Sequence, residues 1–130
     1  MSNAGLILVG AGGHARACID VIGHSNVCEI AGLIGSPNEL GTMVDGCRVI
    51  GIDKDLENFS QLHQHALIAV GHIKSPKVRI ELYEKLLRYG FTFPVIISRR
   101  AYVSDHAIVN SGTIVMHDAL INAGAIVGEN

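Results

Sequence analysis

The sequence LILVGAGGHAR at residues 6–16 decides how the first part of the chain folds. Four apolar residues lead into a cluster of glycines, and a helical pattern of apolar residues follows, which predicts a strand, a tight turn and a helix. Gly10 can make the turn, Gly12 leaves room for a ligand beside the backbone, and the small Ala15 lets the helix pack on the strand. The free N–H groups at the start of this helix favour an anion such as a phosphate or a diphosphate.

The pattern Gly10-x-Gly12-x-x-Ala15 fits the dinucleotide-binding fingerprint, which is a weak signal when it stands alone. Two interpretations stay open, a phosphate-binding loop and a glycine-rich turn that binds nothing. His14 adds an imidazole that can donate to a phosphate or to a sugar hydroxyl. Its alternative role is that of a solvated residue in the first turn of the helix.

Composition excludes several classes of partner. The 130 residues suffice for one domain of ordinary size with a small appendage. The net charge of −2 provides no basic field for nucleic acid or an anionic membrane, and the absence of Trp argues against base-stacking platforms. Although 48% of the residues are hydrophobic, no apolar run reaches the length of a membrane span. We therefore expect neither a nucleic-acid partner nor a membrane partner.

The three cysteines, Cys18, Cys28 and Cys47, are an odd number and lack the C-x-x-C spacing. They are predicted to be small buried side chains in a reducing compartment, not disulfides or zinc ligands. The apolar residues 6–9 are too few for a signal peptide, and no basic residue precedes them. These features indicate a cytoplasmic protein, and no metal site is predicted.

Strand-like and helix-like segments alternate up to residue 98. Strands are expected at 6–9, 28–34, 48–51, 66–70 and 91–97, the last at an edge of the sheet because of Pro94, and residues 35–46 are expected to form a loop with turns at Gly41 and Asp45-Gly46. Such alternation predicts an α/β domain over residues 1–98, with a small Rossmann-like parallel sheet between helices.

Three features mark the expected helices. Gly23 is expected to end the first helix, Asp53 to cap the second, and Ser75-Pro76 to start the third. The apolar positions of the second helix are Leu56, Phe59 and Leu62. Those expected to be buried by the third helix are Val78, Leu82, Tyr83, Leu86 and Leu87.

Three glycine-containing turns follow predicted strands, and the carboxyl ends of parallel strands share one rim of a sheet. These turns are 12–14, Gly35-Ser36 and Gly71-His72. Three such turns on one rim are stronger support for a ligand site there than the first motif alone. No Asp or Glu directly follows the second strand, which counts against NAD because NAD sites use a carboxylate to bind the ribose hydroxyls.

The pattern changes to a six-residue repeat from Ala101 onward, assigned here as a second region over residues 99–130. A branched apolar residue recurs at every sixth position, an apolar residue precedes it, and a small residue stands two positions before it. The branched positions are Val103, Val109, Val115, Ile121 and Val127. This period predicts hexapeptide repeats of a parallel β-helix, in which each hexapeptide makes one side of a prism. These residues supply fewer than two coils, too few to bury their own core, so we expect further coils or a covering subunit.

A Gly-x-Gly-Gly-His turn on a small Rossmann-like domain, followed by hexapeptide repeats, resembles the bacterial sugar O- and N-acetyltransferases, which include sialic-acid O-acetyltransferases and UDP-4-amino-sugar N-acetyltransferases. The resemblance extends over residues 6–130, and its matching stretches include 9–14, 49–51, 69–71 and 80–90. It implies a left-handed β-helix, a homotrimer, and acetyl-CoA bound between adjacent β-helices. It also implies a substrate that is a nucleotide-activated sugar in glycan biosynthesis.

The resemblance assigns substrate-binding roles to Gly12, Gly13, His14 and Gly71. It places the catalytic general base, a histidine followed by an acidic residue, beyond Asn130, together with the coils that bind acetyl-CoA. The dipeptide His117-Asp118 has the right composition but lies several hexapeptides earlier. It can be read as a base with its orienting carboxylate or as a solvated corner, and geometry must decide.

Three hypotheses follow. The first is the substrate-binding part of an acetyl-CoA-dependent acetyltransferase that acts on a sugar or a nucleotide-activated amino sugar, with a UDP- or dTDP-sugar as the expected ligand. The second is a non-catalytic module for nucleotide binding or oligomerisation. The third, an oxidoreductase that uses a nicotinamide cofactor, is opposed by the missing acidic residue and by the repeats.

Overall fold

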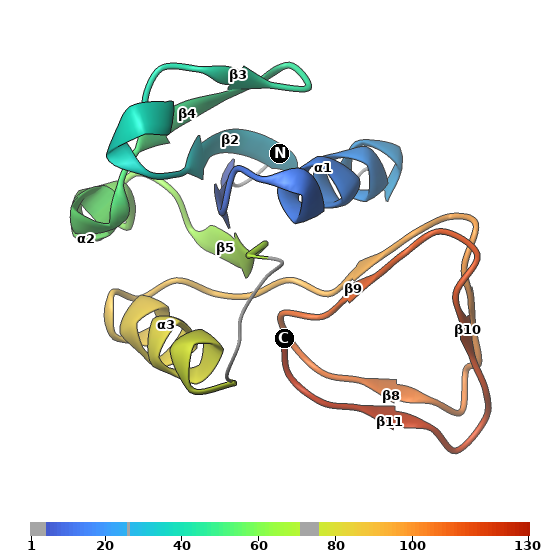
Figure 1. Ribbon diagram of the computed structural model, residues 1–130. Helices are drawn as coiled ribbons and strands as arrows, with labels where there is room; N and C mark the ends of the chain where they lie inside the picture. The colour runs from blue at the N-terminus through green and yellow to red at the C-terminus, as the bar shows by residue number, and fades with distance from the viewer. Residues whose placement is uncertain (1–4, 26, 71–75) are drawn as a thin grey trace.

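The first part of the chain folds around a five-stranded sheet with the strand order β3-β4-β2-β1-β5, seen in Figure 1. The computed structural model describes residues 5–25, 27–70 and 76–130. The strands are β1 (Gly5–Val9), β2 (Glu29–Ile34), β3 (Met43–Val44), β4 (Cys47–Gly51) and β5 (His65–Ile68). All neighbouring strands run parallel except β3, which is antiparallel to β4. The expected α/β domain is confirmed, but its sheet is mixed and not wholly parallel.

The antiparallel strand β3 lies in a segment expected to be a loop. Residues 35–46 instead contain a short 3-10 helix, η1 (Pro37–Glu39), and the first strand of a hairpin. The turn at Asp45-Gly46 has positive φ angles of 46° and 86°, which suit a tight reversal between paired strands. The turn prediction is therefore confirmed, whereas a two-residue strand is too short to produce a visible alternation in the sequence.

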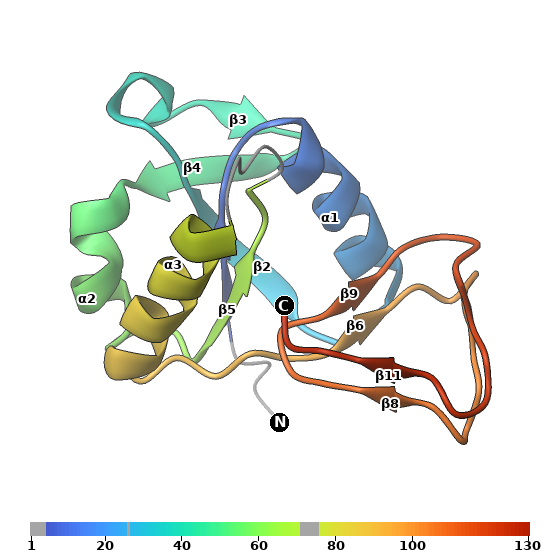
Figure 2. The same cartoon turned by 60° about the horizontal axis from the view of Figure 1, so that its bottom comes forward.

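Helices cover both faces of the sheet, as the two views in Figures 1 and 2 show. Helix α1 (Gly13–Ser25) lies on one face, and α2 (Leu56–Phe59) and α3 (Pro76–Arg88) lie on the other. Alternate residues of β1 point to opposite faces of the sheet. Leu6 and Leu8 pack with α1, whereas Ile7 and Val9 pack with α2 and α3. Both faces are buried, which explains the continuous apolar character of β1.

Two helix boundaries differ from expectation. Helix α1 runs through Gly23 to Ser25, because a glycine inside a helix weakens it by only about 1 kcal/mol. The segment expected to be capped by Asp53 begins with the 3-10 helix η2 (Asp53–Asp55), where the backbone N–H of Ile52 donates to Oδ2 of Asp55 at 2.9 Å. Asp55, and not Asp53, therefore supplies the capping carboxylate.

The apolar side chains of α3 and of the turn after α2 are less buried than expected. Leu86 is fully buried and Leu82 and Tyr83 pack against the core, but Val78 and Leu87 are exposed. Leu62, beyond the end of α2, is 73% exposed. The second helix ends at Phe59, so the helical spacing that would bring Leu62 to the core is lost.

Residues 91–97 were expected to form one edge strand of the sheet, and this prediction is wrong. Thr92 makes an isolated parallel bridge to His65, and Phe91 and Phe93 are buried on the α3 side. The following strand, β6 (Ile96–Ile97), pairs with β9 in the repeat region. The segment therefore leaves the sheet and enters the β-helix.

The remaining strands build a parallel β-helix with three sides. They are β7 (Tyr102–Val103), β8 (Ile108–Val109), β9 (Ile114–Val115), β10 (Leu120–Ile121) and β11 (Ile126–Val127). The pairs β6–β9, β7–β10 and β8–β11 are parallel, so β6 supplies the side that completes two coils. The hexapeptide repeats therefore form the predicted parallel β-helix, with each hexapeptide making one side.

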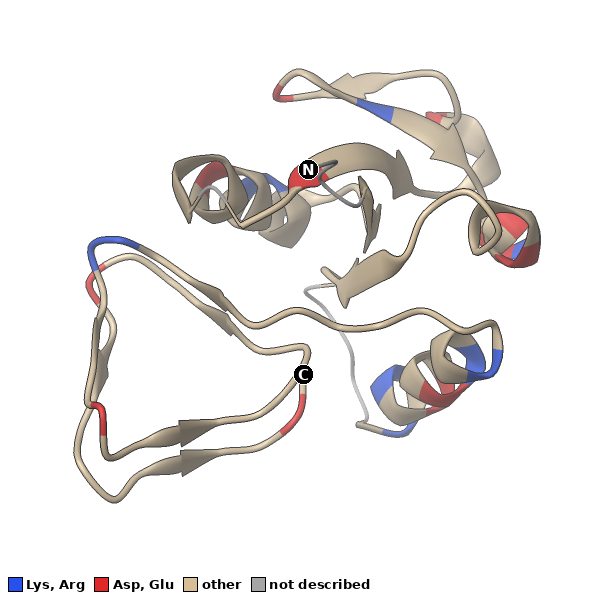
Figure 3. Ribbon diagram, turned by 180° about the vertical axis from the view of Figure 1, so that it is seen from behind, with Lys and Arg blue, Asp and Glu red and all other residues tan. Residues whose placement is uncertain are grey.

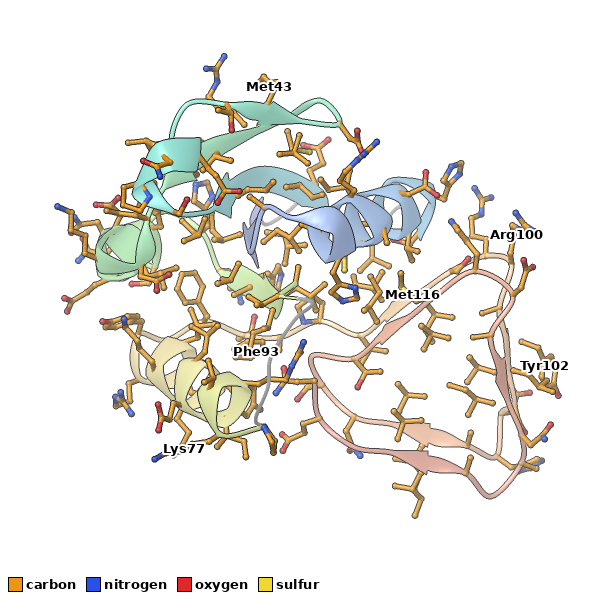
Figure 4. All side chains as sticks on the ribbon, viewed as in Figure 1. Met43, Lys77, Phe93, Arg100, Tyr102 and Met116 are labelled. Atoms are coloured by element: carbon orange, nitrogen blue, oxygen red, sulfur yellow. The ribbon has the colours of Figure 1, made fainter. Side chains whose placement is uncertain are left out.

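The β-helix rests on the first domain through one of its three sides. Ile96 is fully buried, and Ile114 and Met116 pack against the core that contains α1. Figure 4 shows Met116 between the β-helix and α1. No helix among residues 5–25, 27–70 and 76–130 is both long and apolar enough to cross a membrane.

Candidate functional site

A cavity of about 480 Å³ opens where β1 and β5 end. It is lined by Gly10, Ala11, Gly12, Gly13, His14, Ala69 and Val70. Gly10 makes the turn with a φ of 136°, and a Cβ on it would lie 2.6 Å from the carbonyl oxygen of Ala69. The strand–turn–helix prediction is therefore confirmed, and only glycine fits at this first position.

The next glycines leave the cavity open. A Cβ on Gly12 or Gly13 would meet no atom within 4 Å. The first helical hydrogen bond joins the N–H of Arg16 to the carbonyl of Gly12 at 3.2 Å. The N–H groups of the three preceding residues have no acceptor within the helix, because the first turn never provides one. Donors, the positive end of the α1 dipole and the half-buried His14 thus face one cavity, an arrangement that suits a phosphate.

The rim also holds a carboxylate that sequence reasoning missed. A Cβ on Gly35 would lie 3.3 Å from the Cβ of Ala11 and 2.8 Å from Oε1 of Glu39, so Glu39 reaches back to the end of β2. The backbone N–H of Ser36 donates to the same oxygen at 2.8 Å. No acidic residue directly follows β2, as the sequence shows, but the carboxylate of Glu39 folds back beside Gly35. The signal was present as Ser36-x-x-Glu39, the spacing of a capping box.

The third turn expected on this rim is Gly71-His72. Both residues lie outside the described part of the chain, so the role of Gly71 stays a prediction from the resemblance. Its described neighbour, Val70, lines the cavity.

The structure brings His117 together with residues that no motif connected to it. Its Nε2 lies 2.8 Å from Oδ2 of Asp20 on α1, and its Nδ1 lies 2.5 Å from the hydroxyl oxygen of Ser98. A neutral imidazole satisfies both contacts when Nε2–H donates to Asp20 and Nδ1 accepts from the Ser98 hydroxyl. His24, one turn after Asp20, places its ring edge-on to His117 with centroids 5.9 Å apart.

Asp118 does not orient His117. Its carboxylate accepts a hydrogen bond from the guanidinium of Arg100 at 2.8 Å, whereas the two ring nitrogens of His117 contact Ser98 and Asp20. Both ring nitrogens of His117 are engaged, so neither is free to take a proton from a substrate in this arrangement. His117 is also too enclosed for a solvated corner, since its side chain is 26% exposed. It acts as a connection between α1 and the β-helix.

Burial keeps the cysteine thiols protonated. It raises the pKa of Cys18 to about 11, against a smaller opposing effect of the positive charge on Arg79. Burial also raises the pKa values of Cys28 and Cys47. All three are free thiols, and a thiol with a raised pKa is a poor nucleophile near neutral pH. Within the described ranges no cluster of three His, Cys, Asp or Glu side chains is arranged to hold a metal ion.

A second cavity, of about 570 Å³, lies beside α1 over β2 and β4. Its lining is Ile19, Ile22, Gly23, Cys28, Glu29, Ile30 and Cys47. It is larger than the cavity at the glycine-rich turn, but it lacks a helix N-terminus and carries a carboxylate. The smaller cavity is therefore the better site for an anionic ligand.

Known structures share this architecture. A mutant of perosamine N-acetyltransferase from Caulobacter crescentus, in complex with CoA and GDP-perosamine, is 26% identical to the chain and superposes with a TM-score of 0.85. The match covers 99% of this chain and 60% of that protein. The acetyltransferase domain of PglB from Neisseria gonorrhoeae, in complex with acetyl coenzyme A, is 27% identical with a TM-score of 0.82. That match covers 98% of this chain and 60% of the domain.

The chain thus spans about 60% of the length of these solved structures. No curated protein sequence matches it. The sequence profile of the PglD N-terminal domain matches residues 5–86, which include the glycine-rich turn, all five strands of the sheet and most of α3. On this match and on its likeness to bacterial sugar acetyltransferases, the chain belongs to the PglD N-terminal domain family.

Proposed function

We propose that this chain is the nucleotide-sugar-binding part of an acetyl-CoA-dependent acetyltransferase of bacterial glycan biosynthesis. The observation that carries the proposal is the union of an open, glycine-lined anion cavity with β-helix coils on one chain. A structural match over 99% of the chain to a protein solved with CoA and GDP-perosamine supports this proposal.

The glycine-rich turn binds the diphosphate in this proposal. Gly12 and Gly13 let the phosphates approach the backbone, and the N–H groups of the first turn of α1 donate to their oxygens. His14 donates to a phosphate or to a sugar hydroxyl. Glu39 stands at the end of β2, where a carboxylate can accept hydrogen bonds from the ribose hydroxyls.

The β-helix serves the acetyl donor. Acetyl-CoA supplies a thioester, whose carbonyl carbon is attacked by the acceptor amine or hydroxyl of the sugar. The bond from the carbonyl carbon to nitrogen or oxygen forms and the carbon–sulfur bond breaks. A general base takes the proton of the acceptor and passes it to the departing thiolate, so that CoA leaves as its thiol. The resemblance places that base beyond Asn130, so this chain's own residues bind and orient the nucleotide-sugar.

We also propose a homotrimer built through the β-helix. Tyr102 and Leu120 lie on one of its sides and Ile108 and Ile126 on another, and these four side chains are 54–72% exposed. Tyr102 points outward in Figure 4, and Figure 3 shows the charged residues of the β-helix at its corners and not on its sides. Uncharged sides with exposed apolar residues suit contact with neighbouring copies. The free thiols favour the cytoplasm as the compartment.

Calorimetric titration of the chain tests this function. The ligands are UDP, GDP, a UDP-amino sugar, NAD and acetyl-CoA, each added to wild type and to Gly12→Val. Because Gly12 faces open space, the valine fills the cavity without disturbing the fold. Gly23→Val is the matched control, since Gly23 also faces open space but lines the second cavity and not the glycine-lined one.

Saturable binding of a nucleoside diphosphate or its sugar, lost in Gly12→Val and kept in Gly23→Val, supports the proposal. Preferential binding of NAD would replace it with an oxidoreductase, an alternative that the carboxylate of Glu39 makes worth testing. Binding of no ligand would favour an oligomerisation module.

A further inference from the structure

Arg79 stands one hydrogen bond away from the anion cavity. It is the fourth residue of α3 and is half-buried. Its Nη2 donates to the carbonyl oxygen of Val70 at 3.0 Å, and Val70 lines the cavity together with the glycine-rich turn. The side chain thus extends from α3 to the rim where β5 ends.

A second contact fixes the direction of this guanidinium. Nη1 of Arg79 lies 3.4 Å from the carbonyl oxygen of Asn130 at the end of the second coil. Figures 1 and 2 show this C-terminal end on the side of the β-helix that faces α3. The charge of Arg79 is also felt on α1, where it lowers the pKa of Cys18 against the effect of burial. A guanidinium carries five N–H donors, so these two hydrogen bonds leave others available to a ligand.

The cavity needs such a charge. Its described lining contains no Lys, Arg, Asp or Glu side chain, although a diphosphate carries at least two negative charges. The nearest cation along α1, Arg16, is already paired with Asp45 on the β3–β4 hairpin at 3.0 Å. Arg79 can add a charge and a planar pair of donors, the geometry that suits phosphate oxygens.

Arg79 also lines a further cavity, of about 320 Å³, between α3 and the second coil. This cavity is also lined by Ile80, Tyr83, Glu129 and Asn130, and the hydroxyl of Tyr83 donates to Oε2 of Glu129 at 2.9 Å. The carboxylate of Glu129 repels phosphate from the far wall, whereas hydroxyl and amino groups can bind there. Arg79 therefore separates a side suited to phosphate from a side suited to a sugar.

We propose that Arg79 binds the diphosphate of the nucleotide-sugar and orients the ligand, with the nucleoside over β2 and the sugar directed toward Tyr83 and Glu129. This inference rests on the proposed function, because it presupposes that a nucleoside diphosphate occupies the glycine-lined cavity. It adds a binding residue from α3, a helix that carries no phosphate-binding motif.

The test compares Arg79→Met and Arg79→Lys with Arg88→Met, a control that removes an exposed arginine from the other end of the same helix. Each full chain is titrated with UDP and uridine, and with GDP and guanosine. We expect Arg79→Met to lower the affinity for the nucleoside diphosphate by about tenfold to hundredfold and to leave the affinity for the nucleoside unchanged, because only a charge-assisted contact is lost. Arg79→Lys keeps the positive charge but loses the planar pair of donors, so its affinity for the diphosphate should lie between those of wild type and Arg79→Met. Arg88→Met should have the affinity of wild type.

The outcomes separate the two proposals. If wild type binds no nucleoside diphosphate, the proposed function fails and this inference fails with it. If wild type binds and Arg79→Met binds equally well, only the role of Arg79 is wrong. An equal loss for diphosphate and nucleoside would show that Arg79 merely supports the fold through Val70, which also overturns the inference. Should Arg79→Met not fold, the comparison of Arg79→Lys with wild type decides.

Discussion

His117 on the β-helix and Asp20 on α1 meet at a distance of 2.8 Å between Nε2 and Oδ2, although they are 97 positions apart in the chain. The other ring nitrogen is held by the nearly inaccessible hydroxyl of Ser98. The imidazole therefore connects α1, the helix that starts at the anion cavity, to the β-helix.

The first prediction concerns this tie. Ser98→Ala leaves Nδ1 of His117 without its partner and should lower the free energy of unfolding by about 1–3 kcal/mol. Ser104 is the matched control, because it occupies the equivalent position one hexapeptide later and its hydroxyl accepts the N–H of His106 just as Ser98 accepts that of Arg100. Urea denaturation should show a smaller loss for Ser104→Ala. Equal losses would mean that the bond to His117 contributes nothing.

The second prediction separates two glycines of one motif. Gly10→Ala forces a left-handed backbone onto alanine and drives its Cβ against the carbonyl of Ala69, so the variant should be destabilised by more than about 2 kcal/mol. Gly12→Ala should change stability by less than about 1 kcal/mol, because its Cβ enters open space. Thermal unfolding followed by circular dichroism measures both, and a similar shift in the two variants would contradict the account.

The third prediction is a pH dependence from Cys18. Its pKa is about 11 in the folded chain and close to 9 when unfolded, so the folded state holds the thiol proton more tightly. The associated stability is complete below pH 9 and is lost as the pH rises from 9 to 11. Cys18→Ala removes this titration, so its unfolding free energy should fall less steeply over that window. Parallel pH profiles for the two proteins would contradict the expected burial of the thiol.

The fourth prediction tests the proposed trimer. Leu120→Lys and Ile126→Lys place charges on two exposed sides of the β-helix, at side chains that are 65% and 72% exposed. Both variants should keep the folding stability of the subunit but dissociate the assembly, as measured by light scattering. Val27→Lys is the control, since Val27 is 51% exposed on the first domain. An unchanged mass for both β-helix variants would exclude these sides as the interface.

Sequence alone predicts those features that arise from local periodicity. The turn at Gly10 follows from glycines between an apolar run and a helical pattern, and the β-helix follows from branched residues at every sixth position. In both cases, the residues that form the pattern are the residues that form the predicted turn or strand.

What the sequence does not reveal depends on contacts between distant segments. The pairing of β6 with β9 removes residues 96–97 from the sheet, and nothing in their apolar character distinguishes a sheet strand from a coil strand. The hydrogen bonds of His117 join α1 and the β-helix, so the dipeptide His117-Asp118 alone could not distinguish a base from a structural residue. Glu39 could have been found from its capping-box spacing with Ser36, but the position of its carboxylate beside Gly35, which also lies close to Ala11, depends on how β1 and β2 pair.

The most direct test of the central claim is an NMR titration of the ¹⁵N-labelled chain with UDP-amino sugar and GDP-sugar. We expect the backbone amide signals of Gly12, Gly13 and His14 to shift most, together with those near Glu39 and Arg79, while the signals of the exposed β-helix sides stay in place. Saturable binding that leaves the amide signals of residues 12–14 unmoved would contradict the central claim.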